Sequence, residues 1–279
     1  MTDHAMEIRQ GERFGFGANW SRFLSVLDDE RIEEARASLR RRLHLDSLDR
    51  LTFLDIGSGS GLFSLAARSL GAKVHSFDYD PQSVACTSEL KRRYFASDPD
   101  WVVESGSVLD PRYLSRLGQF DVVYSWGVLH HTGQMWAAVE NVVPLVKPGG
   151  RLFIAIYNKQ PFLSTYWTFV KRQYNRSWPV VQQVLDYAFF AFFATAGCAA
   201  DVARGRDPAR RHRGTDNRGM SLYYDVVDWI GGWPFEVATP EECFRFLRKH
   251  QFELIDLVTC GGNHGCNEFV FINRHQPAG

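Results

Sequence analysis

Acidic residues and glycines with the spacing of a ligand-binding loop lie early in this 279-residue chain. Asp55 lies near the end of an apolar run at residues 51–56, and Gly57, Gly59 and Gly61 follow it. Glycines adopt positive φ angles and, lacking a Cβ atom, let a ligand lie directly against the backbone. The pattern predicts a loop that binds a small molecule through backbone groups and a carboxylate.

A second acidic residue narrows the class of ligand. Asp78 ends the next apolar run, where a carboxylate can accept hydrogen bonds from both hydroxyls of a ribose. The G-x-G-x-G spacing differs from the G-x-G-x-x-G loop that holds a pyrophosphate. Asp55 would repel a phosphate, and the first basic residue after it is Arg68. A nucleoside with a cationic amino-acid group fits better than a dinucleotide, which remains the alternative.

The elements that must position these residues follow a regular order. Apolar runs at residues 102–110, 120–126 and 151–158 predict further strands, and residues 135–145 predict a helix. Strands that alternate with helices indicate an α/β fold with a parallel sheet. Since ligands bind at the carboxyl edge of such sheets, the loops after the strands are expected to meet there.

These motifs, in this order, resemble class I S-adenosylmethionine-dependent methyltransferases. The segments F-D-V-V-Y-S, V-L-H-H and L-V-K-P-G-G-R-L-F-I are similar to small-molecule enzymes of the ubiquinone-biosynthesis type. The resemblance covers residues 51–158 strongly. It implies a Rossmann-like seven-stranded sheet with helices on both faces, S-adenosylmethionine as cofactor, and no metal. The cofactor-binding residues that it implies are Asp55, Gly57, Ser58, Gly59, Gly61, Leu62, Phe63, Asp78, Tyr79, Ser107, Val108, Ser125 and Trp126.

Two histidines are the predicted catalytic residues. His130 and His131 follow the strand at residues 120–126. Methyl transfer needs an aligned acceptor, and a hydroxyl acceptor also needs a base. The structural alternative is that each histidine only bonds to the backbone at the start of a helix.

Two segments are additional to a minimal enzyme of this class. Residues 1–50 carry Trp20, expected either to cover the bound ligands or to anchor the segment, and an arginine-rich helix at residues 28–45 whose charges are expected to be solvated. Residues 159–234 form an insertion whose uncharged run at 187–200 is shorter than the roughly 20 residues that cross a bilayer. A buried cap helix is predicted, and a helix on a membrane surface beside nearby arginines is the alternative.

The cap is expected to build a pocket for a small apolar or aromatic acceptor. The residues predicted to contact it are Trp20, Tyr157, Asn158, Trp167, Tyr223, Tyr224, Asp228, Trp229 and His264. Residues 235–279 are predicted to return to the sheet through a helix capped by Thr239 and an antiparallel hairpin. Together the lid (1–50), core (51–158), cap (159–234) and closing segment (235–279) are expected to make one structural domain.

Composition limits the functional class further. Thirty-two basic and thirty-two acidic residues balance, which argues against nucleic acid as the partner. Five scattered cysteines and a polar N-terminus predict reduced thiols in the cytoplasm. O-methylation is the preferred reaction. The alternatives are C- or N-methylation of a small or lipid-like acceptor, a nucleic-acid methyltransferase, and a non-catalytic protein of the same fold. The acceptor and the oligomeric state stay open.

Overall fold

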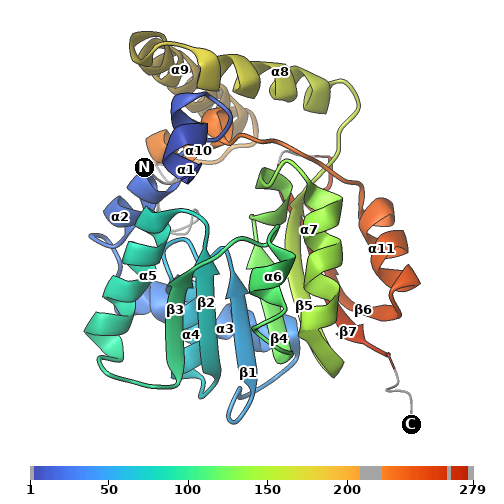
Figure 1. Cartoon of the computed structure of the whole chain (residues 1–279). Coiled ribbons are helices and arrows are strands. Elements are labelled where there is room, and N and C mark those ends of the chain that lie inside the picture. Colours follow the sequence, from blue (N-terminus) through green and yellow to red (C-terminus); the bar gives the residue numbers. More distant parts are fainter. Residues whose placement is uncertain (1–2, 208–221, 263–264, 276–279) are drawn as a thin grey trace.

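A seven-stranded sheet forms the centre of the protein (Figure 1). The computed structural model describes residues 3–207, 222–262 and 265–275. The strand order is β3-β2-β1-β4-β5-β7-β6, and only β7 runs antiparallel to its two neighbours. The strands are β1 (Thr52–Ile56), β2 (Lys73–Asp78), β3 (Trp101–Ser105), β4 (Phe120–Trp126), β5 (Val146–Tyr157), β6 (Phe252–Val258) and β7 (Cys266–Asn273). The predicted α/β class and seven-stranded sheet are confirmed.

Helices cover both faces of this sheet because its central strands are apolar on both sides. In β4, Val123 packs into one core cluster, whereas Val122 and Tyr124 pack into the other. The helices on the Val123 side are α6 (Pro111–Leu114), α7 (Met135–Val142) and α11 (Pro240–Lys249). The helices on the opposite side are α3 (Asp29–Leu43), α4 (Leu62–Ser69) and α5 (Pro81–Tyr94).

Several predicted helix signals have the expected geometry. The Thr239 side chain accepts a hydrogen bond from the backbone of Glu242, whose carboxylate accepts one from the backbone of Thr239, so the capping box is present at α11. At α5 the Asp80 side chain accepts a hydrogen bond from the backbone of Gln82, a simple N-cap that was not predicted from the sequence. The predicted helix at residues 135–145 is shorter, since α7 ends at Val142 and a 3₁₀ turn completes it.

The N-terminal segment lies above the carboxyl edge of the sheet. It consists of α1 (Asp3–Arg9) and α2 (Gly17–Phe23), and Figure 1 shows α1 beside α10 and α2 beside α5. The charges of the helix that follows were predicted to be solvated, and for one of its arginines this prediction is wrong. Arg42 of α3 lies 3.0 Å from Asp256 and 2.6 Å from Glu268, so it ties this helix to β6 and β7.

The insertion after β5 folds into three helices: α8 (Leu163–Arg176), α9 (Pro179–Ala203) and α10 (Leu222–Gly231). Trp167, Val226 and Ile230 form the buried centre of this cap. Figure 1 shows α8 and α9 across the top of the molecule, with α10 between them and the sheet.

The longest cap helix is not buried, contrary to prediction. α9 has 25 residues and, among the described residues, is the one helix long and apolar enough to cross a membrane by length and composition. The uncharged run at residues 187–200 is thus only part of α9, and the helix is longer than predicted from the sequence. Leu185, Phe189 and Phe193 pack against the cap centre, whereas Val184 and Phe192 are each 62% exposed. α9 thus has one packed face and one apolar face in solvent.

Candidate functional site

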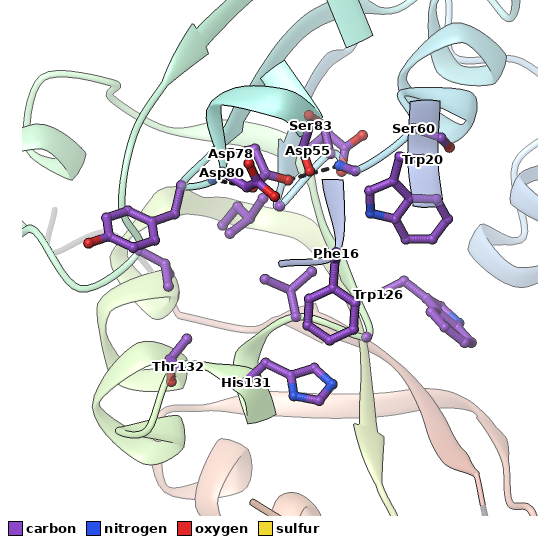
Figure 2. A pocket seen from close by; sticks show the side chains of 18 of the residues that line it. Phe16, Trp20, Asp55, Ser60, Asp78, Asp80, Ser83, Trp126, His131 and Thr132 are labelled. Atoms are coloured by element: carbon purple, nitrogen blue, oxygen red, sulfur yellow. Dashed lines mark hydrogen bonds between the residues drawn. The ribbon is translucent and has the colours of Figure 1, made fainter. Parts of the chain in front are cut away.

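One cavity joins the glycine loop, the N-terminal segment and the cap. Its volume is about 670 Å³, and it lies at the carboxyl edge of the sheet, where the loops after β1, β2, β3 and β4 meet. Figure 2 shows an acidic cluster at one end of it and His131 and Thr132 at the other. A single space therefore contains both a nucleoside-type binding loop and possible catalytic groups.

Two positions of the loop require glycine, because other parts of the protein approach their Cα atoms too closely for a Cβ. Gly57 has φ +76°, and a Cβ there would lie 2.5 Å from the side chain of Val128. Gly61 has φ +82°, and a Cβ would lie 2.8 Å from the Cα of Thr87. Gly57 lines the cavity, whereas Gly61 does not. The predicted ligand contact of Gly61 is thus replaced by a packing role between the loop and α5.

The two acidic residues of the loop region line the cavity, and both have raised pKa values. Ser64 donates a 2.5 Å hydrogen bond to Asp55, and burial raises the pKa of Asp55 to about 7. Asp78 accepts hydrogen bonds from the backbone of Gly59 and of Asp80, each 2.9 Å long. Burial also raises the pKa of Asp78, to about 6, against these bonds. Both carboxylates would be stabilised by a cationic or hydroxyl-bearing ligand.

The charge around the cavity disfavours phosphate. Its described lining includes five aspartates, Asp55, Asp78, Asp80, Asp225 and Asp228, against a single arginine, Arg13. Arg13 already pairs with Glu7 at 2.5 Å. This acidic lining therefore suits a ligand that carries positive charge.

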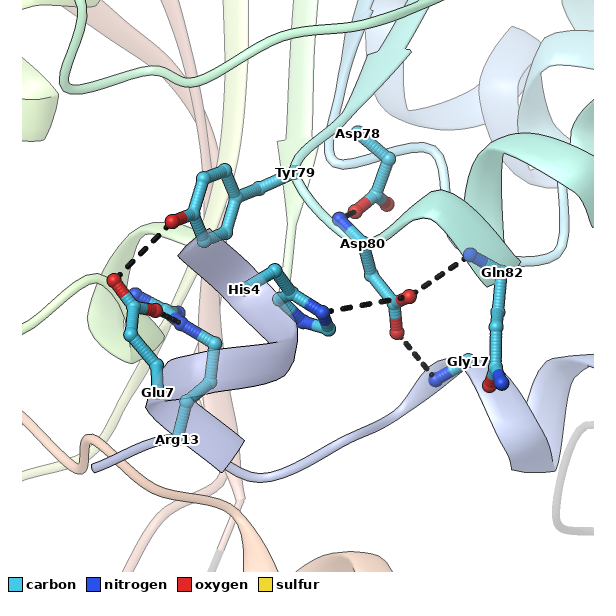
Figure 3. Close-up of polar contacts among 8 residues, drawn as sticks. All are labelled: His4, Glu7, Arg13, Gly17, Asp78, Tyr79, Asp80 and Gln82. Carbon is cyan, nitrogen blue, oxygen red and sulfur yellow. Dashed lines mark hydrogen bonds and ion pairs between the residues drawn. The ribbon is translucent and has the colours of Figure 1, made fainter. Parts of the chain in front are cut away.

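The N-terminal segment is attached to the loop after β2 by polar contacts (Figure 3). The backbone of Gly17 donates a 2.9 Å hydrogen bond to Asp80, and His4 lies 3.8 Å from the same carboxylate. Tyr79 donates a 3.2 Å hydrogen bond to Glu7. These contacts hold the segment against the cavity as a lid.

Only one of the two candidate histidines reaches the cavity. His131 lines it, and its Nδ1 lies 2.6 Å from the carbonyl oxygen of Pro234, which can only accept. The Nδ1–H is therefore the donor, and Nε2 keeps its lone pair. Burial lowers the pKa of His131 to about 3, so the ring is neutral at physiological pH.

His130 is placed differently. It is fully buried and does not line the cavity; its Nδ1 accepts a 3.3 Å hydrogen bond from the backbone of Tyr157. Its ring also packs on that of Tyr157, with centroids 4.0 Å apart. The rings of His130 and His131 lie against each other, with centroids 4.5 Å apart, but only His131 lines the cavity, so His130 supports its wall from behind.

α10 contributes acidic and aromatic groups on the same side of the cavity as His131, whose ring lies close to Gly232, just after the end of this helix. Asp228 and Trp229 both line the cavity, and Asn19 donates a 2.5 Å hydrogen bond to Asp228. Burial raises the pKa of Asp228 to about 7. Lys171 lies behind Trp229, with Nζ 4.4 Å from the centre of a Trp229 ring, and does not line the cavity. This side of the cavity therefore combines aromatic rings with the carboxyl groups of Asp225 and Asp228.

The structure brings most predicted residues to the cavity. Those that line it are Trp20, Asp55, Gly57, Ser58, Gly59, Leu62, Phe63, Asp78, Tyr79, Ser107, Val108, Trp126, His131, Tyr157, Asp228 and Trp229. Trp20 lies over the glycine loop, since a Cβ at Gly59 would be 3.1 Å from its ring.

Other predicted residues lie away from the cavity for identifiable reasons. Ser125 is turned to the backbone of Ile56, to which it donates a 3.1 Å hydrogen bond. Asn158 binds the closing hairpin through Gly261. Trp167 packs in the cap centre, while Tyr223 and Tyr224 contact Tyr187 and Arg22. His264 lies outside the described residues.

Sequence reasoning missed several lining residues. They come from the lid, from α10 and from the hairpin: His4, Arg13, Phe14, Phe16, Asp225, Gly265 and Cys266. The aromatic cluster that contains Trp20 was a signal for Phe14 and Phe16. Phe16 packs on His131, with ring centroids 4.9 Å apart. No local pattern marks His4 or Arg13, because each reaches the cavity through the fold of the lid. Within the described part of the chain, no His/Cys/Asp/Glu group is arranged to hold a metal ion.

Comparison with known proteins agrees with this arrangement. Residues 54–152 match the family described as methyltransferase domain. The chain is 32% identical over 108 residues to a ubiquinone biosynthesis O-methyltransferase from Xanthomonas axonopodis pv. citri, and equally to one from Xanthomonas campestris pv. campestris. These alignments cover 39% of this chain and 44% of each relative, so the chain spans less than half of the relatives' length. The family match ends at residue 152, before the cap.

Solved structures share the fold at low identity. Magnesium protoporphyrin IX methyltransferase from Synechocystis PCC 6803, solved with bound SAH, is 13% identical with a TM-score of 0.50, over 87% of this chain and 81% of that one. An O-methyltransferase family protein from Burkholderia thailandensis is 13% identical with a TM-score of 0.52, over 88% of this chain and 58% of that one. At this identity the likeness establishes the fold.

Proposed function

Because residues 54–152 form a methyltransferase domain of the class I, S-adenosylmethionine-dependent type, we propose that the protein transfers a methyl group from this cofactor to a small molecule. The acceptor is a small, mainly apolar or aromatic metabolite, and the atom methylated is a hydroxyl oxygen. One observation carries the proposal: a single cavity contains the Asp55–Asp78 loops and, opposite them, His131 with Trp229. The evenly balanced charge of the chain supports a small molecule over nucleic acid.

The residues present fit the cofactor. Asp78 can accept hydrogen bonds from ribose hydroxyls, since its two carboxylate oxygens together offer about four lone pairs and the backbone donors of Gly59 and Asp80 bond to different oxygens. Asp55 suits the cationic amino group. Gly57 and Gly59 let the ligand lie against the loop without a Cβ. The acidic lining supports a phosphate-free cationic ligand over a dinucleotide.

When bound, the cofactor supplies an electrophilic methyl group on a sulfonium that leaves readily. The chain must then align the acceptor and exclude water. Phe16 and Trp20 from the lid and Trp229 from the cap are the groups that can exclude water, since all three line the cavity. The proposed role of the cap is therefore the role of α10, rather than of Trp167 or α9.

His131 is the proposed catalytic residue. Its Nε2 is the nitrogen left to accept a proton or hydrogen bond from an acceptor hydroxyl, because Nδ1–H is held by Pro234. Burial holds its pKa at about 3, so His131 is a weak base, and it can act only on a hydroxyl that loses its proton as the methyl group is transferred, such as a phenol. Asp228, with its pKa near 7, is the alternative base in the same cavity.

A second reaction has one observation in its favour. Asp225 and Asp228 on α10 place two carboxyl groups on the acceptor side. A carboxylate can hold a protonated amine and then take its proton, so N-methylation of a small amine is the competing proposal. The odd number and scattered spacing of the five cysteines, which are typical of reduced thiols, support a cytoplasmic location.

The experiment has two stages. Calorimetric titration with S-adenosylmethionine, S-adenosylhomocysteine and NAD should show binding of the first two only; tight NAD binding alone would refute the cofactor assignment. Incubation with methyl-labelled cofactor and panels of phenols, amines and short RNAs, followed by mass spectrometry, should label phenols. Labelling of amines or RNA would replace the acceptor class. If the protein binds the cofactor but labels no molecule in a cell extract supplied as the source of acceptors, a non-catalytic protein would be favoured.

A further inference from the structure

The outer side of the cap carries exposed apolar side chains. They lie at the residue before α8, on α8, on α9 and in the turn between the two helices. The residues that define this outer apolar face are Phe162, Phe169, Trp178, Val184, Phe192 and Val202, which are between 62% and 91% exposed. Figure 1 shows α8 and α9 on the side of α10 away from the sheet. No residue of α8 or α9 lines the cavity, so this face is separate from the proposed active site.

The outer face of α9 is long and without charge. At 1.5 Å per residue its 25 residues extend about 37 Å. The only charged residues of this helix are Asp186 and Asp201. Asp186 accepts a 2.8 Å hydrogen bond from Tyr174 on the inner side, and Asp201 is buried. Both acidic groups are thus directed away from the exposed face. A monomer in water gains nothing from this arrangement, because large exposed apolar patches mark interaction sites.

Basic residues border the face at both ends of α9. Arg172 and Arg176 precede the helix, and Arg204 and Arg206 follow it, all of them exposed. The exposed charged residues of the segment 159–207 are five basic and one acidic: Lys159, Arg172, Arg176, Arg204, Arg206 and Asp207. The border therefore has positive charge, although the whole chain is neutral.

We propose that the outer apolar face docks on the surface of a bilayer that contains anionic phospholipids. The helix would lie flat, with Val184 and Phe192 among the acyl chains and the arginines at the headgroups. α9 cannot span the bilayer in this fold, because Leu185, Phe189 and Phe193 on its inner side pack against the cap.

A second copy of the chain is a poorer occupant. Because both ends of α9 are basic, pairing this helix with itself in either direction would bring arginines next to arginines. Like charges placed opposite each other oppose association. An anionic lipid surface complements the same pattern.

Co-sedimentation of the full chain with lipid vesicles tests the proposal. Binding is expected to vesicles of phosphatidylcholine mixed with phosphatidylglycerol. It should weaken with phosphatidylcholine alone, and also at about 1 M salt, where the screening length is about 3 Å. Absence of binding to the mixed vesicles would overturn the proposal.

Variants locate the contact. Val184→Glu should lower the partition coefficient at least about tenfold, because it replaces an inserted apolar side chain by a charge. Val102→Glu is the matched control, since Val102 is an exposed valine on β3 and should bind as the parent does. Equal binding by Val184→Glu and the parent would overturn the placement. A dimer in sedimentation velocity that Val184→Glu dissociates, without vesicle binding, would assign the face to a second copy.

Discussion

The Nδ1 atom of His131 lies 2.6 Å from the carbonyl oxygen of Pro234. This contact connects the loop after β4 to the chain that leaves the cap, 103 residues later. Because a carbonyl oxygen can only accept, the proton resides on Nδ1, and the Nε2 lone pair is left for a ligand. The cap therefore determines the tautomer of a histidine that lies on the loop after β4.

Replacing His131 should affect turnover more than binding. We expect His131→Ala to lower kcat by about 10²–10⁴-fold, because the acceptor proton loses its receiving group. Calorimetry should show cofactor affinity within a few-fold of the parent. If the variant turns over normally, the role of base passes to Asp228, and Asp228→Asn should then lose kcat instead.

His130→Ala is the companion variant with the opposite expectation. Its ring supports Tyr157 and is fully buried, so its removal should destabilise the fold by about 1–3 kcal/mol. Turnover per folded molecule should fall much less than in His131→Ala. Thermal unfolding and kcat measured on the same samples separate these effects, and an unchanged Tm with lost kcat would reverse the assignment of the two histidines.

Asp78 should contribute to cofactor affinity directly. Asp78→Ala removes a charged acceptor for two hydroxyls, at a cost of about 1.5–3 kcal/mol, or roughly ten- to a hundredfold in Kd. The variant also frees the backbone of Gly59, so loop order adds to the loss. Asp100→Ala, outside the cavity lining, is the control. Equal affinity in Asp78→Ala and the parent would show that the ribose is held elsewhere.

Cofactor affinity should fall with acidification. The raised pKa values of Asp55 and Asp78, about 7 and about 6, mean that both carboxylates become neutral as pH falls from about 8 to about 5. A cationic ligand prefers their ionised forms, so its Kd should rise over this window. The stability of the ligand-free protein changes in the opposite direction. The folded pKa values of these two groups lie above the ordinary value of 3.8, so they contribute stability below pH 3.8 that is lost as pH rises from there to about 6 and 7.

Calorimetry across this pH range should show the change in Kd, and Asp55→Asn should flatten its upper part. A pH-independent affinity in the parent would argue that neither carboxylate contacts the charged portion of the ligand.

The burial of Lys171 should lower the free energy of unfolding at neutral pH. Its Nζ is buried and, among the described residues, has no hydrogen-bond partner; burial lowers its pKa to about 7. In the unfolded chain the amine stays charged up to a pKa near 10.5. The cost of folding is therefore largest below pH 7 and disappears as pH approaches 10.5.

Lys171→Met should accordingly stabilise the protein by about 1–3 kcal/mol near neutral pH, with a smaller gain in alkali. Denaturant titration at two pH values measures this difference, and Lys249→Met, an exposed lysine on α11, is the control. A loss of stability in Lys171→Met would mean that the contact of Lys171 with the Trp229 and Phe235 rings outweighs its desolvation.

Local sequence determined the cofactor half of this protein. The apolar runs, the acidic strand ends and the glycines of the loop predicted the parallel core, because strand period, turn chemistry and the common carboxyl edge of parallel strands are local properties. Asp55, Asp78 and Gly57 accordingly line the cavity, as expected.

Only the tertiary structure decided the acceptor half. Whether His130 or His131 faces the cavity depends on one 3₁₀ turn, and which side of a cap helix is buried depends on what packs against it. Trp167 and Trp229 carry the same side chain on neighbouring cap helices, yet only Trp229 lines the cavity. The apolar run of α9 predicted burial, but α10 and Trp167 cover only one of its sides. Composition records how apolar a helix is, whereas contacts between distant segments determine which of its faces is covered.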